Sequence, residues 1–83
     1  MYFLYVLKSK KDNKFYTGYT NNLKRRFQEH QQGKVRSTNP RRPFELIFYE
    51  AFKSRIDAKR REKYLKTSKG KSSLKQIIRD SLL

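Results

Sequence analysis

The segment Tyr16–His30 (YTGYTNNLKRRFQEH) constrains the fold of this chain more than any other stretch. Aromatic and β-branched residues around a glycine predict a short strand over Phe15–Thr20. The two asparagines that follow predict a turn and a cap for a helix that begins at Leu23. That helix is expected to end around Gln32, because Gly33 is a typical helix-terminating residue.

Arg26 and His30 lie one turn apart on this predicted helix and therefore share one face. At about 100° per residue, both border the apolar stripe formed by Leu23 and Phe27. A cation and an imidazole at the edge of a buried stripe indicate a site. The simpler alternative is an arginine whose stem packs against apolar neighbours while its charged head reaches solvent.

Length and composition limit the class of protein. The 83 residues suit one domain, 1–83, with a small core that depends on large aromatic side chains. The absence of cysteine excludes disulfides and thiolate metal sites, and it suits the reducing cytoplasm. The apolar opening Met1–Leu7 is too short for a membrane span or a convincing signal peptide.

The charge of the chain points to an anionic partner. Its 22 Lys and Arg residues against seven Asp and Glu residues give a net charge of +15, spread along the whole sequence. Such a field favours nucleic acid first and an acidic membrane surface second. The membrane alternative is weak, because the last predicted helix carries no aromatic anchor on its apolar stripe.

The remaining strands complete an α+β fold. A strand over Tyr2–Lys8 forms a hairpin with Phe15–Thr20, and a third strand covers Phe44–Phe52. We expect a small, mainly antiparallel three-stranded sheet flanked by three helices, in the order β-β-α-β-α-α. The sequence leaves open whether Tyr5 lies opposite Tyr16 or one step away.

Strict alternation along the third strand predicts two apolar faces, both covered by helices. One face would carry Phe44, Leu46, Phe48 and Phe52, and the other Ile47, Tyr49 and Ala51.

Two helices follow. A capping box opens the first, which spans Ser54 to about Thr67. The last is expected to begin after Gly70, with a second capping box at Ser73–Gln76. Its apolar stripe indicates packing and little else. That stripe consists of Leu74, Ile77, Ile78 and Leu82.

Glu62 is the unusual residue of the first of these helices. It lies between Ala58 and Leu65 on the face expected to turn inward. A carboxylate in that position is costly unless it is paired, hydrogen-bonded or bound to a cation. A structural ion pair with an arginine explains it as well as a functional role does.

The segment Lys34–Pro43 is predicted to be an extended basic surface loop, because it combines two prolines with several Lys and Arg residues. It is either a plain connector or a surface that holds a phosphate backbone, with Ser37 and Thr38 adding hydrogen bonds. The residues expected to contact nucleic acid here and on the neighbouring helix are Lys24, Arg25, Lys34, Arg36, Arg41 and Arg42.

Five residues together resemble the constellation of the GIY-YIG nuclease domain. The tripeptides Phe3-Leu4-Tyr5 and Tyr16-Thr17-Gly18 match the two tyrosine-bearing motifs, and Arg26, His30 and Glu62 match the residues that follow. The resemblance covers essentially the whole chain and is greatest to small single-domain members, which also carry phrases like REKYLK.

The resemblance implies that Tyr5, Tyr16, Arg26, His30 and Glu62 are catalytic and that Glu62 is the metal ligand. Three positions depart from the family pattern. Phe3 replaces the name-giving glycine, Thr17 replaces the isoleucine, and Tyr19 stands where some members carry a lysine that contacts phosphate or base.

These residue types suit phosphodiester hydrolysis. Glu62 would hold one Mg²⁺ or Mn²⁺ ion, and the lack of other suitably spaced acids disfavours a two-metal site. Arg26 would clamp the phosphate with its planar fork of donors. Tyr5, Tyr16 and His30 compete as the general base, and the resemblance favours a tyrosine.

We therefore expect a metal-dependent endonuclease that cuts DNA with little sequence specificity, in repair or recombination. The alternative is a catalytically silent protein that binds RNA or the ribosome through charge.

Overall fold

Strand β1 (Tyr2–Ser9) is the centre of the sheet in the computed structural model of the chain, which describes residues 1–83. It pairs antiparallel with β2 (Phe15–Thr20) and with β3 (Phe44–Phe52), giving the strand order β2-β1-β3. Four consecutive residues of β1, Leu4–Leu7, are almost inaccessible to solvent. A central strand with both faces buried is expected to be this apolar, and the three strands confirm the predicted sheet.

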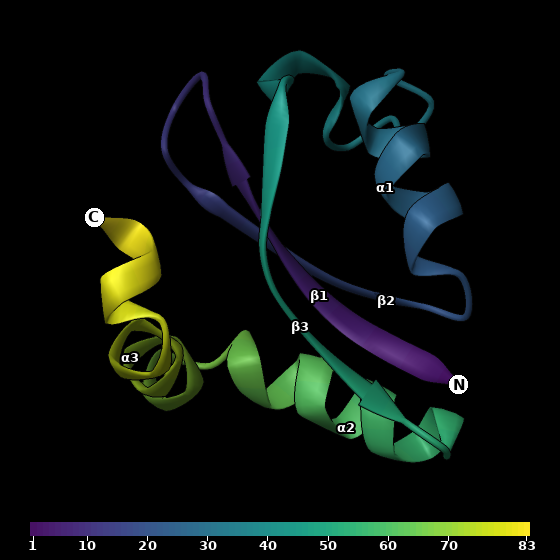
Figure 1. Cartoon of the computed structure of the whole chain (residues 1–83), viewed down its shortest axis with the longest axis vertical. Helices are drawn as coiled ribbons and strands as arrows, with labels where there is room; N and C mark the ends of the chain where they lie inside the picture. Colours follow the sequence, from purple (N-terminus) through teal and green to yellow (C-terminus); the bar gives the residue numbers. More distant parts are fainter.

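The helices form a layer on each face of this sheet (Figure 1). Helix α1 (Leu23–Gln31) covers one face, whereas α2 (Arg55–Leu65) and α3 (Ser68–Ile77) cover the other. Short 3₁₀ turns occur at Asn39–Arg41 and Arg79–Leu82. The α+β fold and its element order are therefore as predicted. None of the helices is long and apolar enough to cross a membrane.

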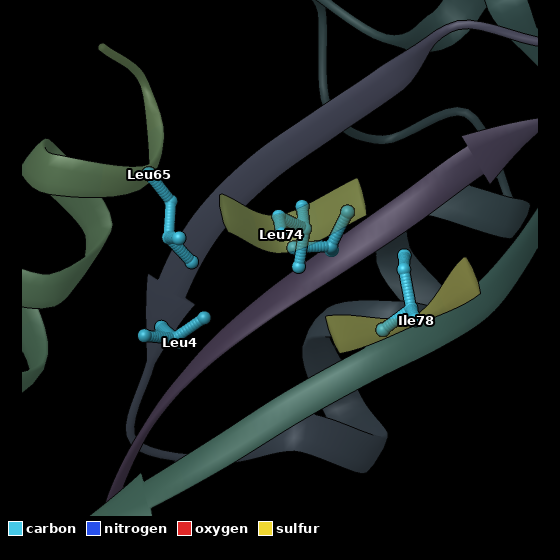
Figure 2. Packing of buried hydrophobic residues seen from close by; sticks show 5 residues of the cluster. Leu4, Leu65, Leu74 and Ile78 are labelled. Carbon is cyan, nitrogen blue, oxygen red and sulfur yellow. The ribbon is translucent and has the colours of Figure 1, made fainter. Parts of the chain in front are cut away.

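The main core lies between the sheet and the α2–α3 layer. Leu4 and Val6 of β1 pack there against Leu65 of α2, Leu74 of α3 and Ile78. Figure 2 shows the side chains of this cluster gathered between the strands and the two helices. Burying an aliphatic side chain of this size contributes about 1.5–3 kcal/mol, so the cluster anchors both helices.

A bulge in β3 changes which residues share a face. Leu46 pairs with Leu7 and Phe48 pairs with Val6, so Ile47 is an extra residue without a partner. After an extra residue the alternation of side chains reverses. The prediction that Phe44, Leu46, Phe48 and Phe52 share a face was therefore wrong. Phe44 and Leu46 pack in the α1 layer, and the others pack in the α2–α3 layer.

The connection between α2 and α3 also differs from the prediction. Helix α2 ends at Leu65, and Thr67 caps α3 by accepting a hydrogen bond from the backbone N–H of Gly70. Gly70 is therefore inside the first turn of α3, and the predicted capping box at Ser73–Gln76 was wrong because Thr67 supplies the cap earlier. A Cβ atom at Gly70 would clash with the carbonyl oxygen of Tyr64, so only glycine fits.

Gly70→Ala should destabilise the fold strongly, because backbone would have to move to relieve this clash. We expect the free energy of unfolding to fall by about 3 kcal/mol, as for overpacked sites. Urea unfolding followed by circular dichroism measures the change. The exposed Ser72 on the same helix provides the control, and Ser72→Ala should change stability little. Equal stability of Gly70→Ala and the native chain would contradict the close approach.

Candidate active site

A buried tyrosine and a buried histidine form the centre of the candidate site. Tyr5 of β1 is 1% exposed and His30 of α1 is fully buried. The hydroxyl of Tyr5 lies 2.8 Å from Nε2 of His30. Helix α1 holds the histidine in place: Asn22 caps its start, as predicted, and Gly33 follows its end with a φ of 77°.

Gly18 makes room for the Tyr5 ring. The two residues are direct partners in the β1–β2 pairing, and Tyr16 pairs with Leu7. Tyr5 is therefore not directly opposite Tyr16, which answers the question of register that the sequence left open. A Cβ atom at position 18 would lie 2.6 Å from the Tyr5 hydroxyl oxygen, so any side chain there would displace the phenol. Tyr16 lies on the same face of β2, and its ring centroid is 6.3 Å from that of Tyr5 and 5.1 Å from that of His30.

Thr38 determines the tautomer of His30. The Thr38 hydroxyl lies 2.8 Å from His30 Nδ1, and it donates to the carbonyl oxygen of Val35 at 3.3 Å. We assign the hydroxyl proton to that carbonyl, and in this assignment the hydroxyl oxygen accepts from Nδ1–H. The other ring nitrogen, Nε2, then carries a lone pair and accepts from the hydroxyl of Tyr5. The result is a directed chain from Tyr5 through His30 to Thr38.

Burial controls the ionisation of both partners. Burial, reinforced by the charge of Arg26, lowers the pKa of His30 to about 4, so the imidazole is neutral near pH 7. Burial also raises the pKa of Tyr5 to about 12, although the neighbouring Arg26 guanidinium opposes that rise. In the free protein the proton therefore stays on the phenol, and the chain of hydrogen bonds is uncharged.

Arg26 lies at the solvent side of this pair. Its side chain is about one-third exposed and donates to Glu29 at 3.1 Å. It also lines, with Arg25 and Arg55, a cleft of about 330 Å³. Arg26 is thus close enough to influence the Tyr5 phenol and open enough to meet an anion.

Two cationic side chains from α2 contact Tyr19, at the position where some family members carry a lysine. Arg55 of α2 donates to the Tyr19 hydroxyl at 3.3 Å, and Lys59 Nζ lies 5.7 Å from the centre of its ring. Sequence reasoning missed both residues, because they lie far along the chain. It also missed Thr38 as the partner of His30, for which no spacing signal exists.

The loop Lys34–Pro43 is folded more tightly than predicted. It contains a 3₁₀ turn, and Thr38 is fully buried, so the expectation that Thr38 bonds phosphate was wrong. Arg41 is partly buried, donates to Asp12 at 3.1 Å and lies 6.0 Å from the Phe44 ring centroid. Five of the six predicted contact residues are exposed. These are Lys24, Arg25, Lys34, Arg36 and Arg42.

The comparison with known families agrees with this geometry. The sequence model of the GIY-YIG catalytic domain matches residues 1–76. The chain belongs to the GIY-YIG family.

Relatives named UPF0213 proteins match along most of their length. UPF0213 protein SH2523 of Staphylococcus haemolyticus is 42% identical over 77 residues, which are 92% of this chain and 93% of that protein. UPF0213 protein CPE1444 of Clostridium perfringens is 36% identical over 83 residues, covering 99% and 88% of the two chains. The solution NMR structure of UPF0213 protein BH0048 from Bacillus halodurans superposes with a TM-score of 0.58 at 36% identity, covering 93% of this chain and 85% of that one.

Glu62, the fifth residue of the GIY-YIG constellation, comes from a different helix than Arg26 and His30. It lies on α2, in the layer opposite α1, and its side chain is 18% exposed. Its Oε2 accepts from Lys66 Nζ at 3.1 Å, so its partner is a lysine and not the arginine considered from the sequence. The charge of Glu62 still reaches the site, where it contributes to the raised pKa of Tyr5.

GIY-YIG nucleases generally use divalent metal ions, and one side chain of the candidate site, Glu62, is of a type that such ions bind. The carboxylate of Glu62 is a hard oxygen ligand, and its Oε1 accepts no hydrogen bond. No group of three acidic or histidine side chains gathers anywhere in the structure, so Glu62 is a single candidate ligand. Mg²⁺ or Mn²⁺ held by one carboxylate would take its other ligands from water and substrate phosphate.

The buried neutral His30 should make folding sensitive to acid. Its pKa is about 4 when folded and about 6.5 when unfolded, so only the unfolded chain binds the proton between these values. The free energy of unfolding should therefore fall as the pH is lowered from about 6.5 to 4. The native chain should lose about 2 kcal/mol more than His30→Gln over this range, as measured by urea unfolding at each pH. Parallel pH profiles for the two proteins would show that His30 is not buried in the neutral form.

Proposed function

We propose that this GIY-YIG chain is a metal-dependent endonuclease that hydrolyses DNA phosphodiester bonds with little sequence specificity. One observation carries the proposal: a buried His30 whose tautomer is set to accept the proton of Tyr5, beside the accessible cation of Arg26. A core that only needed packing would not require this directed chain of polar groups.

The substrate phosphate would bind at Arg26. The planar guanidinium can donate two hydrogen bonds to phosphoryl oxygens, and it would stabilise the charge that grows on them during attack. A bound anion would also offset the charge of Arg26, which helps to lower the pKa of His30. Substrate binding would therefore make His30 a better proton acceptor.

Tyr5 would pass a proton from water to His30. The phenol is held protonated in the free protein, so it can accept a proton from the attacking water only as it gives its own to Nε2 of His30. The water oxygen forms a bond to phosphorus while the P–O bond to one sugar oxygen breaks, and that oxygen would take a proton from solvent. Tyr5 ends neutral and His30 ends as the imidazolium. Nε2 of His30 lies 2.8 Å from the Tyr5 hydroxyl, so a proton that reaches this nitrogen would come from Tyr5.

Glu62 would hold the ion. When bound, a Mg²⁺ or Mn²⁺ ion supplies polarisation of the phosphoryl oxygens and lowers the pKa of a coordinated water. Tyr16 packs against the rings of Tyr5 and His30 and would keep them aligned.

The partner and setting follow from the charge. A net charge of +15 with exposed cations suits backbone contacts, which position DNA without reading its sequence. Weakly selective cutting suits a role in DNA repair or recombination. The cysteine-free composition suits the cytoplasm.

A silent nucleic-acid-binding protein is the second candidate, and two observations favour it. Lys66 already neutralises Glu62, and the pKa values of about 12 for Tyr5 and about 4 for His30 both oppose proton transfer in the free protein. On this view the basic surface binds RNA or DNA and no bond is broken.

Cleavage of supercoiled plasmid with Mg²⁺ or Mn²⁺ tests the proposal. Arg26→Lys and Glu62→Gln should each slow nicking by at least about 100-fold, the effect of removing a group that stabilises developing charge. Glu45→Gln, on the exposed side of β3, is the matched control and should cleave normally. A chelator should stop the reaction.

Two outcomes would reject the nuclease. Cleavage that persists undiminished in both variants indicates a contaminating enzyme. Tight binding of DNA or RNA with no product under any metal condition supports the silent binding protein.

A further inference from the structure

A second basic surface lies outside the candidate active site. A groove of about 710 Å³ runs between the edge strand β2 and the helices α2 and α3. Its polar and basic lining residues are Asn13, Lys14, Tyr16, Thr17, Lys66, Lys71 and Lys75, and its apolar ones are Phe15, Leu65 and Leu74.

The charge of this groove is of one sign. Four lysines and no acidic residue line it. Lys71 and Lys75 stand one turn apart on α3, and neither forms an ion pair. Like charges at this spacing repel and weaken a helix slightly, so they are stabilised when an anion lies between them. The groove therefore suits a polyanion.

The floor of the groove narrows the choice of polyanion. Phe15 presents partly exposed apolar surface among the lysines, whereas Leu65 and Leu74 belong to the core and only close the groove from inside. Inorganic phosphate would leave that surface uncovered. A nucleic-acid strand would cover it, because sugars and base faces are apolar while the phosphates reach the lysines at the rim.

Two residues that line the groove also contact residues of the candidate site. Tyr16 lines the groove and also packs against His30. Lys66 lines the groove and bonds Glu62. A strand that leaves the reacting centre along β2 would therefore enter the groove directly.

We propose that this groove binds the substrate DNA strand on one side of the cleaved phosphate, through Lys14, Lys71 and Lys75. The identity of the ligand rests on the proposed function. The surface itself is different from the Lys34–Pro43 loop, and it gives α3 a binding role in addition to packing.

Fluorescence anisotropy with a labelled DNA duplex in EDTA tests the groove without cleavage. The double variant Lys71→Ala/Lys75→Ala should bind more weakly, and the slope of log Kd against log salt should fall by about 1 for each lysine removed. The matched control is Lys53→Ala/Lys69→Ala, which loses the same charge at exposed positions outside the groove. Its slope should change much less.

The variants also separate binding from chemistry. In cleavage assays Lys71→Ala/Lys75→Ala should raise KM and leave kcat nearly unchanged. The reason is that these lysines contact the DNA at a place distant from the phosphate that reacts. Lys71→Gln/Lys75→Gln loses the same charge but keeps a longer side chain. It should show the same rise in KM as Lys71→Ala/Lys75→Ala. Thermal unfolding checks that both pairs remain folded.

The outcomes distinguish this inference from the proposed nuclease. If Lys71→Ala/Lys75→Ala and Lys53→Ala/Lys69→Ala weaken DNA binding equally, or if neither weakens it, the groove does not bind DNA. Cleavage by the native chain would still support the nuclease. Native chain that binds DNA through the groove pair and never cleaves it overturns the nuclease and supports the groove. If the groove instead binds an acidic protein segment, Lys71→Ala/Lys75→Ala should bind DNA as the native chain does. That result would also contradict the inference.

Discussion

The structure depends on one buried hydrogen bond, from the hydroxyl of Tyr5 to the imidazole of His30. Two polar rings placed between a sheet and a helix are costly to bury unless each polar atom has a partner. Thr38 completes the set by binding the far side of the imidazole, and no buried side-chain polar atom is left unpaired. The pair therefore ties β1, α1 and the following loop together, and it places Arg26 at the edge of the same cluster.

Five of the seven acidic residues of the chain form ion pairs. Asp12, Glu29, Glu50, Asp57 and Glu62 each pair with an arginine or lysine. Because these pairs are partly exposed, each contributes little to stability. Their larger effect is on the surface field, since the uncompensated lysines and arginines remain free to attract an anionic polymer. Glu62 differs from the others because its charge also acts on Tyr5.

Local patterns in the sequence were enough to predict most of the fold. The bounds of β2 and β3 and the start of α1 agree with alternation, capping and turn chemistry, which act between near neighbours. The bulge at Ile47 was missed because it depends on the partner strand, and no single-strand pattern reveals it. Thr67 was missed as a cap because Gly70 reads as a helix breaker, whereas tight packing against Tyr64 explains it.

The candidate site was predictable only in part. The spacing of Arg26 and His30 placed both on one helix face, but the burial of His30 and its bond to Thr38 arise from a loop that crosses back over α1. That folding also buries Thr38 and pairs Arg41 with Asp12. Long-range contacts of this kind have no local sequence signature.

The position of β2 at the margin of the sheet has a consequence for association between copies of the chain. Its outer backbone groups pair with no other strand, and such a margin can template edge-to-edge joining. Here the ammonium groups of Lys14, Lys71 and Lys75 border that margin. Two copies that approached through it would bring these charges face to face, so electrostatic repulsion protects the free strand against aggregation at low salt.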